Sequence, residues 1–299
     1  MLEPLILSFI IIGSVIMLGD IVFYLVFMVR LRDVISSGKR SDDIWKNIGF
    51  VLLLFFLAGY LIVGFVFNPD IITALIMLFG AVFVSIMLFL THHLLETAKE
   101  RSMEIAQVLV DVMDERDPNL NGHSHHVKEV TMTFYKYLPY NLKSKINQVS
   151  LEYASLMHDI GKLGVPEAIL NKPDKLNKEE WDIMKTHPKK GVKILEPIKT
   201  FDSISDWIMY HHERVDGNGY YNMKPEEVPL AAKIIAIADT YSAITMRRSY
   251  KAPRSHEEAM EIIKDVAGTQ LDKELVEIFL TIPKEELIKC SRQLNNHEK

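Results

Sequence analysis

The run LMHDIGKLG, at residues 156–164, sets a histidine and an aspartate side by side in apolar surroundings. The apolar neighbours predict that His158 and Asp159 are buried on a helix, where both groups are costly unless a partner satisfies them. A metal ion is such a partner. Lys162 follows four residues after the histidine and three after the aspartate, on the same face of the expected helix. The run therefore predicts a helical domain built around a metal site.

More side chains of the same kind follow along the chain. They are His187, the pair His211-His212, and Asp239, which ends the apolar stretch of residues 234–239. A lone histidine in such a place is usually a structural residue. A set of titratable groups in apolar surroundings is instead typical of a functional site.

The composition indicates two unlike parts. Of the 299 residues, 48% are apolar and 24% are charged, and long apolar runs dominate residues 1–97. The net charge of −5 gives no indication of a groove for a DNA or RNA polymer. The single cysteine, Cys290, excludes an intrachain disulfide and a cysteine-based zinc cluster.

Three segments are long and apolar enough to cross a bilayer, at residues 4–29, 48–67 and 71–90. Basic residues gather in the loop after the first segment and in the stretch after the third. They are Arg30, Arg32, Lys39, Arg40, Lys46, Lys99 and Arg101. The positive-inside rule then predicts a multi-pass protein of the cell (inner or plasma) membrane, with its N-terminus outside and its C-terminal domain in the cytoplasm.

Two polar features of the membrane part have competing interpretations. Asp20 lies within the first span, and such a carboxylate is either a functional site or a polar contact between helices. His92 and His93 stand where the third span ends, and we interpret them as interfacial residues rather than metal ligands.

The third span continues without a breaker, so residues 91–116 are expected to extend it as one helix. Its apolar side has the spacing of a short parallel coiled coil, which would join two chains as a homodimer. The same side would also suit the first helix of the following domain, and both interpretations stay open. The expected division is a membrane domain at 1–97, a linking helix at 98–118 and a cytoplasmic catalytic domain at 105–299.

Helix signals fill the C-terminal part, and strand signals are scarce. Asn177 with Glu180, and Ser255 with Glu258, have the spacing of capping boxes, and Gly268 is a natural stop signal. Residues 231–244 form a further clear helical pattern. The predicted fold class is all-α, with three transmembrane helices followed by an all-helical domain.

Five segments together carry a family resemblance. In order and spacing they resemble the HD-GYP family, a branch of the HD phosphohydrolases, over roughly 180 residues. The segments are HDIGK (158–162), ILNKP (169–173), MKTHP (184–188), HHERVDGNGY (211–220) and IAD (237–239). The resemblance implies an all-helical, metal-dependent phosphodiesterase that hydrolyses the bacterial messenger cyclic di-GMP to linear pGpG, with further hydrolysis to GMP left open.

The family's metal ligands match seven positions of this chain. They are His123, His158, Asp159, His187, His211, His212 and Asp239. The resemblance implies that Asp159 bridges two divalent ions and that Lys162 lies near the scissile phosphate, so these two residues are the expected catalytic pair. A mixed set of nitrogen and oxygen ligands suits iron or manganese, with zinc as the alternative.

A basic segment, RRSYK at residues 247–251, looks like the family's Arg-Pro-Tyr-Arg segment. The resemblance implies that Arg248 and Lys251 bind the substrate's phosphates or guanine, together with Lys162. An arginine fork can both donate paired hydrogen bonds and stack on a base. A solvated basic loop is the competing interpretation.

The chain departs from the family pattern at several places. Gly219-Tyr220-Tyr221 stands where the family has Gly-Tyr-Pro, and the lost proline removes a constraint on φ in a loop linked to substrate access and to partner proteins. Ser242 replaces a common aspartate, and Ser249 a common proline. Asn119 replaces the glutamate of three-metal members, which favours a two-metal centre.

These departures keep two further hypotheses open. One is an HD-domain hydrolase of another cyclic dinucleotide or nucleotide. The other is a non-catalytic, nucleotide-binding membrane receptor, against which the complete set of ligand residues argues.

Overall fold

The computed structural model describes residues 3–35, 40–67, 69–116, 122–246 and 252–297. Within these ranges the chain is helical and has no strand beyond an isolated bridge between Ala267 and Leu271. The predicted all-α class is therefore confirmed. The chain divides into two compact units, residues 1–102 and residues 103–299.

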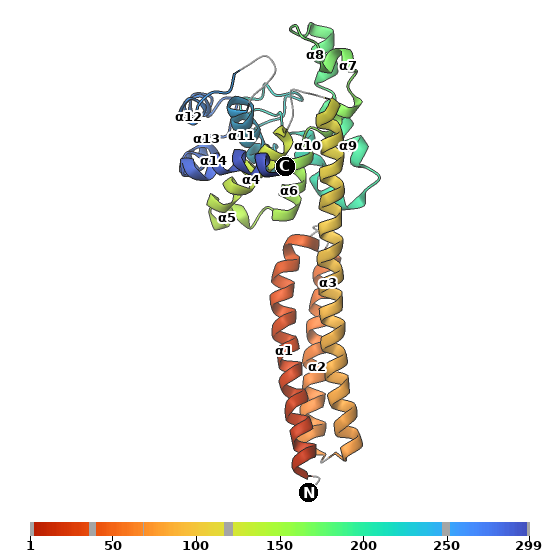
Figure 1. Cartoon of the computed structure of the whole chain (residues 1–299). Helices are drawn as coiled ribbons and strands as arrows, with labels where there is room; N and C mark the ends of the chain where they lie inside the picture. Colours follow the sequence, from red (N-terminus) through yellow and green to blue (C-terminus); the bar gives the residue numbers. More distant parts are fainter. Residues whose placement is uncertain (1–2, 36–39, 68, 117–121, 247–251, 298–299) are drawn as a thin grey trace. The chain divides into compact units, whose positions relative to one another are not determined.

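The first unit is a bundle of α1 (Glu3–Ile35), α2 (Arg40–Val66) and the first part of α3 (Ile71–Arg116) (Figure 1). The three helices contain apolar stretches that are long enough to cross a membrane. Many of their large side chains face outward, as lipid-facing side chains do; Phe55 is 71% exposed and Phe79 is 67% exposed. A small buried cluster holds the bundle together: Ile10, Met17, Tyr60, Ala74 and Ala81.

Asp20 of α1 is buried and accepts a hydrogen bond from the Ser85 hydroxyl of α3. This contact matches the interpretation of Asp20 as a polar contact between helices. His92 packs edge-on against Phe27, with ring centroids 4.9 Å apart.

Helix α3 runs unbroken to Arg116, so the predicted continuation of the third span is present. In the second unit, its side chains Ala106, Val110 and Met113 are buried in the core. The opposite side of the same helix leaves Ile105 and Val108 exposed. Helix α3 therefore serves as the first helix of the second unit and keeps an uncovered apolar side.

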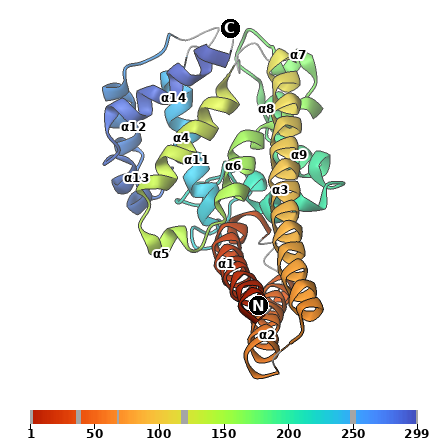
Figure 2. The ribbon, with the colours of Figure 1, turned by 60° about the horizontal axis from the view of Figure 1, so that its bottom comes forward.

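The other helices of the second unit follow in short steps along the chain. They are α4 (His123–Tyr137), α5 (Tyr140–Lys143), α6 (Gln148–Met157), η1 (Ile160–Gly164), α7 (Glu167–Leu170), α8 (Lys178–Met184), α9 (His187–Leu195), η2 (Lys199–Ile204), α10 (Ser205–Met209), α11 (Leu230–Thr245), α12 (His256–Asp265), α13 (Lys273–Phe279) and α14 (Lys284–His297). Helix α4 packs against α6, α11 and α14 in the centre of this unit (Figure 2). Most side chains of α11 are buried, which makes it the central helix of the core.

Local sequence signals are reproduced closely. Both predicted capping boxes form, with the Asn177 side chain at the start of α8 and the Ser255 side chain at the start of α12. Gly268 has φ +81, a left-handed conformation that a glycine adopts without strain. Each of these features depends on residues that are close in sequence.

The expected helix through His158 and Asp159 is wrong in one respect. Helix α6 ends at Met157, His158 caps it, and the chain continues as the short 3-10 helix η1. The cause is a close approach to α9, because a Cβ added at Gly161 would lie 1.8 Å from the backbone oxygen of His187. After the break, the Asp159 carboxylate lies 3.1 Å from the imidazole of His187 at the start of α9.

We predict that Gly161→Ala lowers the stability of the full-length protein by roughly 1–3 kcal/mol or more, because the new methyl group meets rigid backbone. Gly164→Ala is the matched control in the same short helix. Its added Cβ would meet only the flexible side chain of Lys190, so it should cost much less. Denaturant unfolding of both variants in detergent tests this, and equal stability of the two variants would contradict the close approach.

Candidate metal centre

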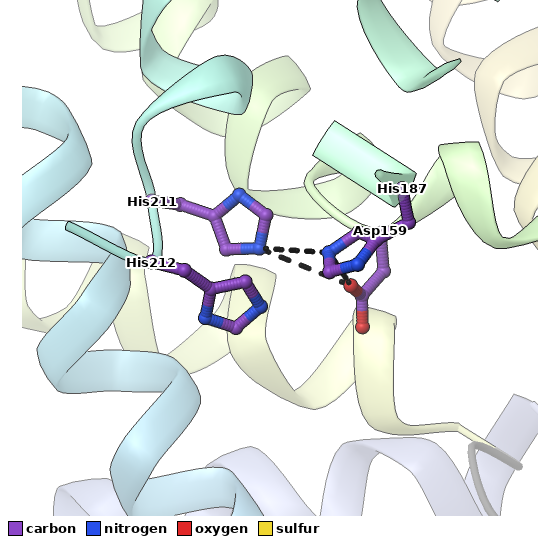
Figure 3. A group of neighbouring side chains, drawn as sticks. All are labelled: Asp159, His187, His211 and His212. Atoms are coloured by element: carbon purple, nitrogen blue, oxygen red, sulfur yellow. Dashed lines mark hydrogen bonds and ion pairs between the residues drawn. The ribbon is translucent and has the colours of Figure 1, made fainter. Parts of the chain in front are cut away.

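Five parts of the second unit bring their polar side chains to one buried place. The four residues Asp159, His187, His211 and His212 each offer a ligand atom, and these atoms all lie within 4.8 Å of one another. Figure 3 shows their side chains pointing toward one another, with the two neighbouring histidines on one side and Asp159 and His187 on the other. The backbone break after α6 and the first residue of α9 supply the latter two.

A second group shares one member with the first. His123, His158 and Asp159 also offer ligand atoms within 4.8 Å of one another. Asp239 of α11 joins this group through His123, because its Oδ1 lies 3.0 Å from the histidine Nε2. All seven residues that the sequence analysis predicts as ligands are therefore brought together, and Asp159 belongs to both groups.

Three of the histidines are held in the same way by the backbone. The Nδ1 atoms of His158, His187 and His211 lie 2.8, 3.0 and 2.6 Å from the carbonyl oxygens of Ser155, Met184 and Ile208. A carbonyl oxygen only accepts, so each Nδ1 carries the proton. In the neutral ring, Nε2 then keeps its lone pair and faces the site. Fixing the ring through its other nitrogen is typical of metal-ligating histidines.

Two buried polar atoms of the site lack ordinary hydrogen-bond partners within the described residues. His158 Nε2 and Asp159 Oδ1 are buried and make no hydrogen bond of normal geometry in the described part of the chain. The His187 Nε2 atom lies 3.1 Å from Asp159 Oδ1 and 3.5 Å from His211 Nε2. An unsatisfied buried polar atom costs about 1–3 kcal/mol. A metal ion would satisfy these atoms together, so the residues fit a metal ion.

Most pKa shifts at the site suit metal binding, and His158 is the exception. Burial alone would lower its pKa, but the charge of Asp159 outweighs burial and raises it. Burial, followed by the neighbouring histidines, lowers the pKa of His211 well below its usual value and that of His212 to about 3. Burial alone would raise the pKa of Asp159, but the charges of Lys162 and His158 outweigh it and hold that pKa well below its usual value. The hydrogen bond and the charge of His123 likewise outweigh the effect of burial and lower the pKa of Asp239. Neutral imidazoles and ionised carboxylates are the forms that bind metals.

Lys162 lies where the spacing predicts, although on a 3-10 helix. Its Nζ is 2.7 Å from Asp159 Oδ2. The side chain is 17% exposed, so the ammonium group stands between the buried carboxylate and the surface of the site. This brings a positive charge to the edge of the candidate metal centre.

A cavity of about 180 Å³ opens beside the centre. His211, His212 and Asp239 form one wall, and Arg214 and Gln270 are among the polar residues of the other walls. The Arg214 guanidinium is already paired with Asp216, at 2.6 Å between Nη2 and Oδ2. The cavity gives the candidate metal centre room for part of a polar ligand.

Two residues of the site were not predicted as functional from the sequence. The Glu213 carboxylate is buried and accepts hydrogen bonds from the backbone N–H groups of Tyr221 at 2.6 Å and Met223 at 2.9 Å. It thus anchors the loop that lacks the family's proline. The Tyr220 ring packs on the His212 ring, with centroids 4.6 Å apart. Sequence signals existed for both, because Glu213 directly follows the two histidines and Tyr220 belongs to the Gly-Tyr-Tyr motif.

The described residues do not include every predicted site position. Arg248, Lys251 and Asn119 lie outside the described ranges, as does Ser249. The predictions made for them from the resemblance stay predictions.

Comparisons with known proteins agree with the residue pattern. A cyclic di-GMP phosphodiesterase of Thermotoga maritima is 34% identical over 187 residues, which cover 61% of this chain and 50% of that protein. A 3'3'-cGAMP-specific phosphodiesterase 1 of Vibrio cholerae is 33% identical over 183 residues, which cover 60% of this chain and 42% of that protein. The chain thus matches about half or less of the length of these curated relatives.

Among solved structures, the HD domain of the L. monocytogenes phosphodiesterase PgpH in complex with cyclic-di-AMP superposes with a TM-score of 0.44 and 19% sequence identity, covering 62% of this chain and 96% of that one. A profile of the HD domain matches residues 93–275, which contain all seven candidate ligands. Because this match covers more than half of the chain, the protein belongs to the HD-domain family, as its motifs predict.

Proposed function

We propose that the chain is a membrane-anchored, metal-dependent phosphodiesterase that hydrolyses cyclic di-GMP to linear pGpG. The observation that carries this proposal is the convergence of seven ligand side chains on one buried site with Asp159 in both ligand groups. The names of several relatives support the substrate class, since they are called cyclic di-GMP or 3'3'-cGAMP-specific phosphodiesterases.

Two divalent ions, iron or manganese with zinc as the alternative, are the cofactors that we propose for this site. Asp159, His187, His211 and His212 would hold one ion. His123, His158 and Asp159, with Asp239, would hold the other. When bound, such a pair supplies a water nucleophile near neutral pH and stabilises charge on an anionic phosphate.

The chain's own residues bind and orient the substrate. Lys162 Nζ, held at 2.7 Å from Asp159 Oδ2, can neutralise a non-bridging phosphate oxygen as negative charge develops on it. The nearby cavity and the Tyr220 ring give a polar and an aromatic surface next to the centre. Arg248 and Lys251 are proposed to hold the second phosphate or a guanine.

We propose the following arrangement in the cell. The N-terminus is outside, the catalytic domain is cytoplasmic, and two chains associate through the exposed side of α3 that carries Ile105, Val108 and Val112. The three- and four-residue spacing of these side chains is that of a coiled-coil seam. The loop with Gly219-Tyr220-Tyr221 is a further proposed contact for a partner protein.

A different cyclic dinucleotide is the second candidate substrate. A relative named for 3'3'-cGAMP matches this chain at 33% identity, against 34% for a cyclic di-GMP relative, so similarity does not separate the two substrates. The loop at Tyr221 lacks the family's proline and is held instead by the Glu213 carboxylate. This loop is the structural feature that favours a changed substrate preference.

The first test is turnover of cyclic di-GMP by the full-length protein, purified in detergent without oxygen and supplied with iron or manganese. We expect hydrolysis by the wild type and background rates for a His158→Ala, Asp159→Ala double variant, because the shared carboxylate is lost. The matched control deletes another His–Asp pair, His125 and Asp111, which lies at the surface with 2.7 Å between Nε2 and Oδ1. This control should keep its activity.

Metal-loaded wild type that fails to cleave cyclic di-GMP would overturn that substrate assignment. Parallel assays with 3'3'-cGAMP and other cyclic dinucleotides then separate the second candidate from a receptor that binds nucleotides without cleaving them.

We also predict that Lys162→Gln lowers kcat/KM by about 10²–10³-fold, because one cationic donor to the phosphate is removed. Metal content should stay close to that of the wild type, since the lysine is not a ligand. Lys190→Gln is the control, because Lys190 Nζ donates to the Gly164 carbonyl oxygen and, within the described residues, to no candidate ligand. An unchanged kcat/KM for Lys162→Gln would remove the lysine from the proposed chemistry.

A further inference from the structure

A chain of hydrogen bonds leads from His123 away from the candidate metal centre. Ser242 Oγ on α11 lies 2.9 Å from His123 Nδ1 and 2.9 Å from His126 Nδ1. His126 Nε2 lies 3.0 Å from Ser291 Oγ on α14. His126 and Ser242 are fully buried, while Ser291 is partly exposed. These hydrogen bonds therefore connect His123, a candidate metal ligand, to the edge of the second unit.

The hydrogen bonds between these groups can run in only two consistent directions, from His123 to Ser291 or from Ser291 to His123. A neutral imidazole carries one N–H and a hydroxyl donates one proton. When His123 Nδ1 donates to Ser242, the serine donates to His126 Nδ1, and His126 Nε2–H donates to Ser291. When His123 instead carries its proton on Nε2, every donor and acceptor along the chain exchanges roles.

The surroundings of His123 decide between the two directions. Without a metal ion, Nε2–H can donate to Asp239 Oδ1, which lies 3.0 Å away. With a metal ion, Nε2 must offer its lone pair, so the proton has to sit on Nδ1. In each of the two directions, the Nδ1 atoms of both histidines and the hydroxyl of Ser242 all have hydrogen-bond partners. Both directions need the same number of protons, so the exchange is a change of tautomer and involves no change of charge.

Burial keeps His126 neutral, as both directions require. It lowers the pKa of this imidazole to about 3, with a smaller contribution from His123. The proton that leaves His123 Nε2 passes to water, and water at the partly exposed Ser291 end resupplies the chain. Protons are therefore balanced between the two directions.

Resting on the metal centre proposed above, we propose that Ser242, His126 and Ser291 are positioning residues whose hydrogen-bond direction selects the metal-binding tautomer of His123. They touch neither the substrate nor a proposed metal ion. They act through the ring of His123 and so adjust the affinity of the centre for its metal. A partner at the other nitrogen of a ligating histidine commonly changes metal affinity by about 10–100-fold.

A purely structural role would predict something different. In that case His126 would keep one tautomer whether or not metal is bound. The structure also offers a matched control in Ser124 of α4. Ser124 directly follows His123 and is as buried as Ser242. Its hydroxyl makes no hydrogen bond within the described residues.

The test is nitrogen NMR of the full-length protein in detergent, with ¹⁵N-labelled histidine, before and after loading with Zn²⁺. We expect the proton of His126 to move from Nδ1 in the metal-free protein to Nε2 in the zinc-loaded protein. Ser242→Ala should remove this response and weaken zinc binding by about 10–100-fold in a chelator competition. Ser124→Ala should leave both measurements as in the wild type.

Zinc binding without a change in the His126 tautomer would overturn this inference and leave the metal centre intact. Failure of zinc, iron and manganese alike to bind would remove the metal centre and the inference with it. If Ser242→Ala does not fold, Ser291→Ala replaces it, because that serine is partly exposed and ends the chain. In zinc-loaded Ser291→Ala the Nε2–H of His126 loses its hydroxyl acceptor, so zinc binding should weaken, and an unchanged zinc affinity would count against the hydrogen-bond chain.

Discussion

The carboxylate of Asp159 is a buried negative charge, and the rest of the site is arranged to make that charge tolerable. A carboxylate in an apolar interior costs several kcal/mol unless it is paired and hydrogen-bonded. Lys162 supplies one compensating charge at 2.7 Å, and the imidazole of His187 approaches within 3.1 Å. One oxygen still lacks a hydrogen bond of normal geometry among the described residues. We propose that a carboxylate so placed is a metal ligand, and the family to which the chain belongs supports that interpretation.

The backbone does much of the positioning. Three ligand histidines are fixed through carbonyl oxygens three residues before them, which leaves Nε2 of each ring facing the centre. Gly161 lets the backbone after α6 approach the start of α9, which brings Asp159 within reach of His187. A site built on such rigid supports loses little entropy when a metal ion binds. The cost is the unsatisfied polar atoms that remain when no ion is present.

Features that depend on residues close in sequence were predicted, and features that depend on contacts between separate elements were missed. The capping boxes at Asn177 and Ser255 depend on residues three positions apart, and both were predicted. The ligand set was predicted because a family pattern preserves its order and spacing. The break after Met157 was missed, because it arises from contact between η1 and α9. The role of Ser242 likewise depends on residues distant in sequence, and that of Glu213 on the folding of the loop that follows it. Periodicity and local propensity contain no information on such contacts.

The most direct test of the central role of Asp159 is the metal content of the full-length protein, purified without oxygen and measured by elemental analysis. The account predicts about two divalent ions per chain in the wild type. Asp159→Ala should lose most of both, because this carboxylate belongs to both ligand groups. His187→Ala should lose mainly one, because it belongs to a single group. A wild type without bound metal, or an Asp159→Ala variant with full metal content, would contradict the account.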